Sequence, residues 1–434
     1  MLIATYNRWQ LTEVEEGSNF PAVNGTDPAT GYDGEAERTA ELRRELELLA
    51  AEYPGLEVRE VPRKVLLNPG PATMSGNVRL AQLAPDICPR ETEFADLMRG
   101  IREDLVRVVH GDPNLHTAVP FCGSGTINMD VCLNSLLPPE KKILVLNNGA
   151  YSTRGADICR YYDLPHYVLD LPVDRPIDPE EVRAALQEYP DVGLVYTTHH
   201  ETGTGVLNPI REIGALVRAA GAYFVVDTTA SLAMLPLNLC EDPVDFVMSS
   251  AQKGLMAVTG LSFVIGRRDI IEASAGFPKR SYYCNLYRQY NYFETTGEMH
   301  FTPPVQAVYA LRAAIDEYFA VGEETRFARH QELAALARRE LAALGFREMI
   351  APEHQSGLVL AYLYPTDPNW SFTAVHDYCY ERGFTIYPGK VAGLGCFRIC
   401  TLGTLVPKDI ENFAAVMKEA LIATGVALPV TYAS

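Results

Sequence analysis

The sequence predicts an α/β fold in which helices cover both faces of a mostly parallel sheet, followed by a smaller α+β domain. In the middle of the chain, short apolar runs rich in Val, Ile, Leu and aromatic residues alternate with helical patterns. Strands that alternate with helices indicate βαβ units and a parallel sheet. After a long helical stretch the order changes to isolated strands and helices, which is typical of a small α+β domain.

The first 60 residues are predicted to form an extension with one helix. Gly, Asn, Asp and Pro are frequent in residues 16–34, and this composition favours irregular structure. Leu42, Leu46 and Leu49 then recur at helical spacing, and Pro54 ends the pattern. An apolar stripe needs a partner surface, so we expect this helix to dock, either on a dimer or over the entrance of a site.

Residues 61–318 are expected to form the large domain. Its predicted strands and helices lie at 143–146, 179–188, 192–196, 210–220, 223–226 and 262–265. In sheets of this kind, ligands bind at the carboxyl ends of the strands. Asp227 and the segment after Tyr196 follow predicted strands, so we expect a ligand near them.

Residues 319–434 are expected to form the small C-terminal domain. Apolar residues at helical spacing predict a long helix over 319–344 that bridges the two domains. A strand at 358–364, a helix at 374–381 and a strand at 396–400 follow.

Composition and charge describe an ordinary globular protein and exclude several classes. The net charge of −18 opposes nucleic acid and anionic membranes as partners, because both require basic patches. No apolar run approaches the roughly 18–20 residues that span a bilayer, and the first residues lack the apolar centre of a signal peptide. Nine scattered cysteines favour neither a disulfide framework nor a metal site. We therefore expect a reduced, cytoplasmic protein without a bound metal.

Three features of the large domain point to one ligand. Lys253 lies among small, uncharged residues, 26 positions after Asp227, which ends an apolar run. A buried Lys and a buried Asp are costly unless a group between them uses both. The third feature is the run 123–126, whose glycines and hydroxyls precede a helical segment and are suited to bind a phosphate. Pyridoxal 5′-phosphate needs all three features. Its aldehyde bonds to an amine, its ring nitrogen pairs with a carboxylate, and its phosphate needs a binding site.

Each feature has an ordinary explanation when it is taken alone. Asp227 could be a turn residue or a helix cap, Lys253 a surface lysine, and the glycine run a tight turn. The polar segment 196–205 could be a simple connecting loop. Because all three features occur together in one chain, a bound cofactor is a better interpretation than three separate ordinary explanations. In that interpretation Asp227 keeps the ring nitrogen protonated, and Lys253 later acts as a general base.

The local sequences resemble those of the class V aminotransferases, a group of the fold-type I pyridoxal-phosphate enzymes. The resemblance runs from about residue 64 to about residue 420 and rests on the runs at 66–71, 88–91, 123–126, 148–151, 200–205, 226–227, 249–253, 301–304, 386–390 and 397–399. Within that family, the runs Phe301-Thr-Pro-Pro304, Pro388-Gly-Lys390 and Phe397-Arg-Ile399 are similar to those of the 2-aminoethylphosphonate–pyruvate branch.

The resemblance implies roles for individual residues. Lys253 would bond covalently to the cofactor and Asp227 would pair with its ring nitrogen. The implied cofactor-binding set is Ser124, Gly125 and Thr126 at the phosphate, Tyr151 stacked on the ring, Thr202 at its phenolic edge, and Thr229, Gln252 and Thr302, together with Asp227 and Lys253. Thr302 would reach the phosphate of the neighbouring subunit, which implies a homodimer. Arg398 would bind the acidic end of the substrate.

The implied reaction transfers an amino group from 2-aminoethylphosphonate to pyruvate and gives phosphonoacetaldehyde and alanine. A related transaminase that uses another amine or amino acid donor, with glyoxylate or pyruvate or in a specialised biosynthetic pathway, remains open. A lyase or desulfurase of the same fold is a further alternative, for which Cys396 near Arg398 is the candidate cysteine. A binding protein that has lost catalysis is the last, and the joint presence of Lys253, Asp227 and Arg398 speaks against it.

Overall fold

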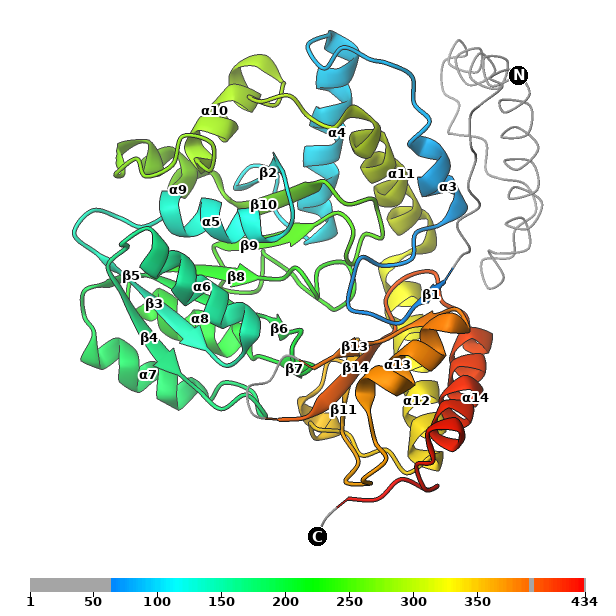
Figure 1. The fold of residues 1–434 in the computed structure, drawn as a ribbon. Helices are drawn as coiled ribbons and strands as arrows, with labels where there is room; N and C mark the ends of the chain where they lie inside the picture. The colour runs from blue at the N-terminus through cyan, green and yellow to red at the C-terminus, as the bar shows by residue number, and fades with distance from the viewer. Residues whose placement is uncertain (1–63, 390–393, 433–434) are drawn as a thin grey trace. The chain divides into compact units, whose positions relative to one another are not determined.

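A seven-stranded sheet lies at the centre of the larger part of the protein (Figure 1). The computed structural model describes residues 64–389 and 394–432; the predicted extension and its helix, and Lys390, lie outside the described residues. The strand order is β2 (His116–Cys122), β10 (Leu261–Arg267), β9 (Phe246–Ser250), β8 (Tyr223–Asp227), β5 (Val192–Thr198), β3 (Lys142–Asn147) and β4 (His166–Asp170). Only β10 runs antiparallel to its neighbours. The predicted mostly parallel sheet is therefore confirmed.

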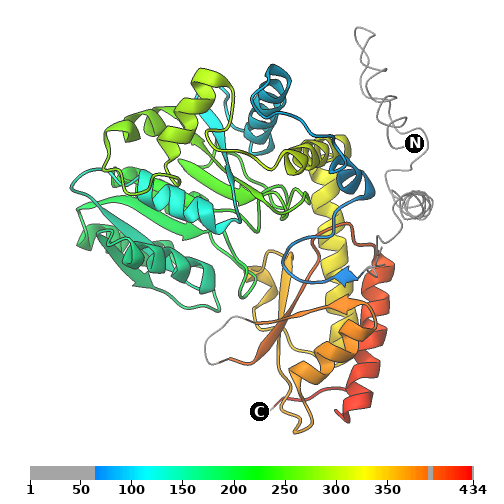
Figure 2. The ribbon, with the colours of Figure 1, turned by 45° about the horizontal axis from the view of Figure 1, so that its top comes forward.

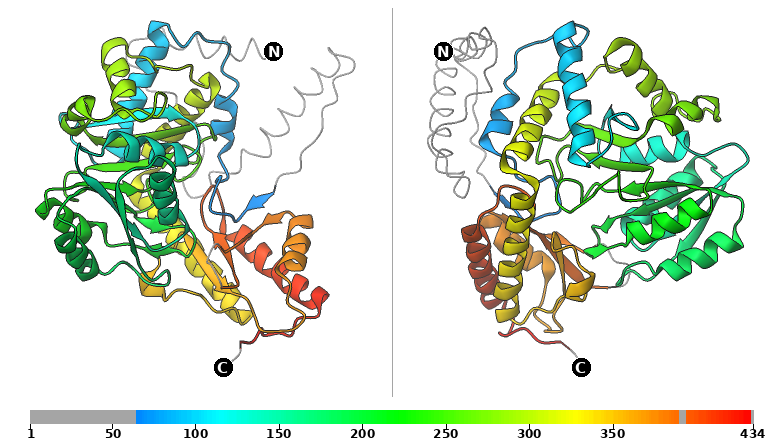
Figure 3. Two further views of the ribbon diagram at one scale, coloured as in Figure 1. Left: turned by 60° about the vertical axis from the view of Figure 1, so that its left-hand side comes forward. Right: turned by 180° about the vertical axis from the view of Figure 1, so that it is seen from behind.

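Helices cover both faces of this sheet. Figures 1 and 3 show α5 (Thr126–Ser135) and α6 (Ala150–Tyr161) on one face, and α7 (Pro179–Glu188) and α8 (Ile210–Ala219) on the other. This division follows from right-handed crossovers, because β3 to β4 and β5 to β8 step across the sheet in opposite directions. Among the described residues, no helix combines the length and apolarity that crossing a bilayer requires.

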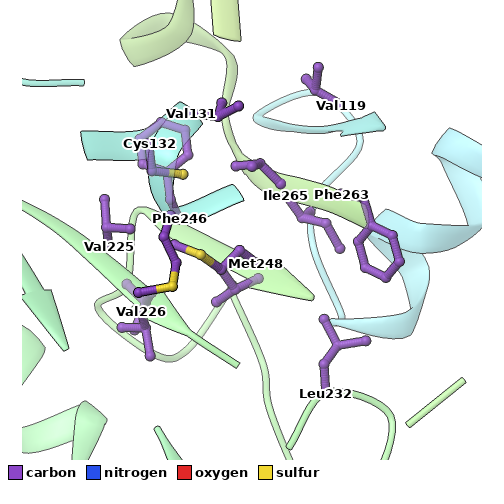
Figure 4. Close-up of a cluster of buried hydrophobic side chains, with 14 of the residues drawn as sticks. Val119, Val131, Cys132, Val225, Val226, Leu232, Phe246, Met248, Phe263 and Ile265 are labelled. Carbon is purple, nitrogen blue, oxygen red and sulfur yellow. The ribbon is translucent and has the colours of Figure 1, made fainter. Parts of the chain in front are cut away.

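The core of the sheet explains why its strands are apolar almost throughout. Val225 and Val226 are neighbours in β8 and point to opposite faces, yet both are fully buried. Figure 4 shows them with Phe246 and Met248 of β9 and with Cys132 of α5, which packs onto the sheet. Both faces of the central strands are therefore closed to water, and polar groups are left for the strand ends.

The C-terminal part is built around a smaller sheet. Its antiparallel strands are β11 (Val359–Leu363), β14 (Cys396–Cys400) and β13 (Tyr387–Pro388), and α12 (Glu323–Ala343), α13 (Phe372–Glu381) and α14 (Pro407–Thr424) pack nearby, as Figure 2 shows. Its hydrophobic core is separate from that of the large sheet and includes Leu67 from the start of the described chain. There, β1 (Val65–Leu66) pairs with β12 (Phe384–Thr385).

The predicted bridging helix over 319–344 is interrupted, which corrects the sequence-based expectation. The structure has α11 (Val305–Val321) and α12, separated by Gly322 with φ 83° and ψ 146°. A side chain would disfavour this backbone conformation, so glycine allows the chain to turn between two helices. The division into domains at residue 319 remains a prediction.

Candidate active site

The carboxyl ends of β5, β8 and β9 meet at one edge of the large sheet. Asp227 is the last residue of β8 and stands in register with Thr198, the last residue of β5. It is also paired in register with Met248 of β9, and Lys253 follows three residues after that strand ends. Parallel strands thus bring Asp227 and Lys253 to the same edge, as the spacing of the two residues predicts.

A backbone loop from the start of the described chain holds Lys253. The Lys253 Nζ atom donates a hydrogen bond to the carbonyl oxygen of Pro69 at 2.6 Å. The next residue, Gly70, has φ +111°, and a Cβ atom placed there would lie 2.4 Å from Lys253 Nζ. Ala72 N–H donates to the carbonyl oxygen of Gln252 at 2.9 Å. The Asn-Pro-Gly-Pro run is therefore the wall against which the lysine rests.

Asp227 is a buried carboxylate on which the charges of Arg154 and Lys253 act. Its Oδ1 atom accepts a hydrogen bond from the Thr229 N–H at 2.8 Å. Burial raises the pKa of the Asp227 carboxyl, whereas the bonds from Thr229 and the charges of Arg154 and Lys253 oppose that rise. A carboxylate in this setting is suited to hold a second cationic group, such as a protonated ring nitrogen.

The glycine run leads into the N-terminus of α5, next to the ends of β8 and β9. A Cβ atom on Gly125 would lie 3.1 Å from Thr229 Cγ2 and 3.4 Å from Ser250 Oγ, so these three residues adjoin. The first turn of α5 contains no acidic residue. The Ser250 hydroxyl is buried and has no hydrogen-bond partner in the described part of the chain. A positive helix end beside an unsatisfied hydroxyl fits an anionic acceptor such as a phosphate.

Tyr151 lies in the first turn of α6 and is linked to the start of α5 through Arg154. The Arg154 guanidinium donates to Thr126 Oγ1 at 3.0 Å and lies 4.9 Å from the centre of the Tyr151 ring. Burial raises the pKa of the Tyr151 hydroxyl, and the charges of Arg398 and Arg154 oppose that rise. Tyr151 is thus placed between the glycine run and the arginine predicted to bind substrate.

Glu201, in β6 (His200–Glu201), is fully buried against the N-terminus of α6. Its carboxylate accepts hydrogen bonds from the N–H groups of Gly203 at 3.0 Å and Tyr151 at 3.3 Å. Burial raises the pKa of the Glu201 carboxyl to about 7, although these N–H groups favour its charged form. A Cβ atom on Gly149 would lie 2.4 Å from Glu201 Cδ, so the approach requires glycine there.

Arg398 is a buried cation, and its hydrogen-bond partners among the described residues are carbonyl groups. Its side chain, 1% exposed in β14, donates to the carbonyl oxygen of Thr202 at 2.8 Å and to that of Pro388 at 2.9 and 3.2 Å. No carboxylate of the described residues forms an ion pair with it. A buried guanidinium without a counter-ion is costly, and an anionic ligand would offset that cost.

The remaining predicted residues divide between the site and the surface. Gln252 is buried beside Lys253, and its Oε1 atom lacks a hydrogen-bond partner within the described ranges. Thr302 is exposed between α10 (Leu286–Thr296) and α11, and its carbonyl oxygen accepts a hydrogen bond from Cys122 Sγ at 3.7 Å.

Sequence reasoning missed Arg154, Glu201 and Ser250 as site residues. Arg154 follows Tyr151 by one helical turn, so their shared helix face was a usable signal. Glu201 lies inside the polar segment after β5, and Ser250 directly precedes the lysine run. Nothing local in the sequence shows that Glu201 is buried against α6, because its partner in that helix, the N–H of Tyr151, is 50 residues away.

Known proteins that are similar to this chain include aminotransferases. Residues 79–375 match the family model described as aminotransferase class V. A protein from Burkholderia thailandensis named 2-aminoethylphosphonate–pyruvate transaminase is 34% identical over 365 residues, which cover 84% of this chain and 98% of the relative. A transaminase of the same name from Cupriavidus pinatubonensis is 32% identical, with 84% and 96% covered.

Solved structures of aminotransferases share the fold. The alanine–glyoxylate aminotransferase from Nostoc sp. superposes with a TM-score of 0.79 at 24% identity and covers 86% of this chain and 99% of that one. The pyridoxamine–pyruvate aminotransferase from Mesorhizobium loti gives a TM-score of 0.75 at 22% identity, with 86% and 95% covered. The chain belongs to the class V aminotransferase family.

Proposed function

We propose that this aminotransferase moves the amino group of 2-aminoethylphosphonate to pyruvate, giving phosphonoacetaldehyde and alanine. The observation that carries the proposal is Arg398, a buried guanidinium that pairs with no carboxylate of the described chain. Phosphonates and carboxylates both match the fork of a guanidinium. The choice of 2-aminoethylphosphonate and pyruvate is supported by the names of the relatives that align with most of the chain.

Pyridoxal 5′-phosphate is the cofactor of this proposal. When bound, it supplies an aldehyde that exchanges with amines and a ring that accepts electrons. The N-terminus of α5 with Gly125 and Ser250 fits the phosphate, Asp227 fits the ring nitrogen, and Lys253 offers the amine. The proposal also assigns Ser124, Thr126, Thr229 and Gln252 to the cofactor site, with Tyr151 covering the ring.

Lys253 is assigned the proton transfer. Its Nζ atom would take the proton from the amine-bearing carbon of the donor and pass it to the cofactor. In the second half-reaction the same atom would carry a proton from the cofactor to C2 of the acceptor. The bond to the Pro69 carbonyl fixes where Nζ lies, and Gly70 leaves no side chain to displace it. Such placement matters, because a shift of about 1 Å can reduce rate about a hundredfold.

Arg398 is assigned the binding of both substrates. The phosphonate of the donor and the carboxylate of pyruvate are anions that occupy the site in turn, so one cation can serve both half-reactions. The carbonyls of Thr202 and Pro388 orient the guanidinium before either substrate arrives. Burial of Arg398 excludes water and strengthens its pairing with an anion.

The desulfurase alternative is disfavoured by the state of Cys396. This residue is 2% exposed, and burial raises the pKa of its thiol. A Cβ atom on Gly389 would lie 2.0 Å from Cys396 Sγ, so the thiol is packed against backbone. A nucleophilic cysteine needs the opposite setting, with access and a lowered pKa.

Steady-state turnover tests the choice of substrate. Alanine formation from pyruvate would be measured with 2-aminoethylphosphonate, β-alanine and L-serine as separate donors, at one ionic strength. The largest kcat/KM is expected for 2-aminoethylphosphonate. β-Alanine is the matched control, because it replaces the phosphonate with a carboxylate on the same carbon chain. Faster turnover of an amino acid would leave the assignment as an aminotransferase unchanged and would exclude 2-aminoethylphosphonate as the preferred donor.

A further inference from the structure

A cavity that Lys253 does not line lies at α10 and the loop before it. Its volume is about 670 Å³, and its lining residues come from positions 279–300. None of Lys253, Asp227 or Arg398 borders it. Figure 1 shows α10 beside α9 (Arg268–Ala273), on the part of the molecule opposite the three-stranded sheet.

The lining is cationic in a strongly acidic protein. Lys279, Arg280 and Arg288 border the cavity, and no Asp or Glu of the described residues does, although the whole chain carries −18. The acidic residue Glu298 is near in sequence, but it forms an ion pair with Arg90 at 2.8 Å.

None of the three cations is neutralised by a carboxylate of the described chain. Arg280 donates to the carbonyl oxygen of Asn134 at 3.1 Å, and burial lowers its pKa. The Arg288 guanidinium lies 3.9 Å from the centre of the Tyr282 ring. Lys279 is exposed at the rim of the cavity. Positive charges that border one cavity without counter-ions repel one another, and a bound anion would offset that repulsion.

Other groups in the cavity suit a ligand larger than a single ion. His300 borders the cavity, and its Nδ1 atom is buried and lacks a hydrogen-bond partner among residues 64–389 and 394–432. Asn285 and Asn291 add amide groups, and the rings of Tyr282 and Tyr292 add apolar surface. Volume and lining together match an organic anion with one strongly charged end.

We propose that this cavity binds a small organic molecule through a phosphonate or phosphate group. Lys279 and Arg288 contact the group's oxygen atoms, Arg280 adds charge from behind, and the tyrosine rings contact the organic part. A doubly charged tetrahedral group is favoured over a single carboxylate, because three cationic side chains border the cavity. The site is additional to Arg398, and its occupation does not depend on which substrate the enzyme turns over.

Calorimetric titration of the cofactor-loaded enzyme with methylphosphonate tests the proposal. This probe has no amine and cannot react. In an Arg398→Gln background, where the catalytic anion site is removed, we expect one equivalent to bind per protomer. Adding Lys279→Gln and Arg288→Gln should weaken that binding at least tenfold. If Arg398→Gln does not fold, the same pair in the wild type should remove one bound equivalent.

A charge-matched control separates a site from general attraction. Arg99→Gln and Lys408→Gln remove the same charge from exposed, ion-paired positions elsewhere. Unchanged binding in this control supports the cavity; equal weakening in both variants, or no binding at all, overturns it. Inorganic phosphate is titrated in parallel. Weaker binding of phosphate identifies the organic part as a contact, and equal binding assigns the site to the tetrahedral anion alone.

Discussion

The N–H of Tyr151 lies 3.3 Å from the carboxylate of Glu201, a side chain that is fully buried. The neighbouring residue, Thr202, gives its carbonyl oxygen to Arg398. The adjacent residues Glu201 and Thr202 therefore bind both the start of α6 and the guanidinium that is assigned to the substrate. Glu201 is best described as a positioning residue, because it acts through Tyr151 and Thr202.

Glu201→Gln should change how stability depends on pH. The pKa of Glu201 is raised to about 7 in the folded protein, against about 4.3 for an ordinary glutamate. Between these values the folded state holds a proton that the unfolded state has lost, so wild-type stability falls as pH rises through this window. Over the whole window the loss amounts to at most about 4 kcal/mol. Urea unfolding at pH 5 and pH 8 should show a smaller decrease for the variant; equal decreases would exclude this role.

Gly70→Ala should impair catalysis without unfolding the protein. The new Cβ atom would meet Lys253 Nζ at 2.4 Å and displace it, with an expected loss in kcat of about a hundredfold or more. Gly76→Ala, in α3 (Gly76–Ala81), is the matched control, because a Cβ atom added there would meet no other atom within 4 Å. Circular dichroism and kcat would be compared for the two variants. Equal activities would disprove the close packing of Lys253.

Ser250→Ala should weaken cofactor binding. If the unsatisfied hydroxyl donates to the phosphate, its loss removes about 1 kcal/mol or somewhat more, roughly tenfold in Kd. Tyr362→Phe also removes a buried hydroxyl that has no partner within the described chain, but from the core of the C-terminal part, and should leave that Kd unchanged. Fluorescence titration would give the dissociation constant of pyridoxal phosphate for both variants. Equal constants would show that the Ser250 hydroxyl does not bind the phosphate.

Arg398→Gln should weaken both half-reactions. Removing one partner of a buried charged pair costs roughly 2–5 kcal/mol, so kcat/KM should fall at least about thirtyfold for donor and acceptor alike. Arg339→Gln, at an exposed position, provides the control. A decrease confined to one substrate would show that the two anions do not share the guanidinium.

Thr302 offers a test of the homodimer. If it completes the site of the neighbouring subunit, Thr302→Val and Lys253→Ala should each be nearly inactive. Mixed dimers of the two variants should regain activity, because one site then combines an intact Lys253 with the partner's intact Thr302. Mixing without recovery, in dimers shown to exchange subunits, would place Thr302 outside the site.

The pattern of apolar residues along the chain predicted the strands and helices well. A strand that is buried on both faces is a continuous apolar run with polar residues at its ends, which is easy to recognise in the sequence. The helix at 179–188 and the strand at 396–400 have the predicted bounds. The helix break was missed because a glycine inside an apolar helical pattern is compatible with either outcome, and only the fold requires Gly322 to turn.

The site was predictable only in part. Asp227 and Lys253 lie at strand ends, where order along the chain implies closeness in space. Arg398 and Glu201 each have one partner that is distant in the sequence: Thr202 is 196 residues from Arg398, and Tyr151 is 50 residues from Glu201. Such contacts depend on tertiary packing, which no local spacing records.

The visible spectrum of the cofactor-loaded enzyme, recorded with one amino donor at a time and no keto acid, is the most direct test of the central claim. We predict that 2-aminoethylphosphonate abolishes the absorption band of the lysine-bound cofactor and that pyruvate then restores it. The Lys253→Ala variant should lack that band from the outset. Loss of the band with another donor while 2-aminoethylphosphonate has no effect would contradict the proposed substrate.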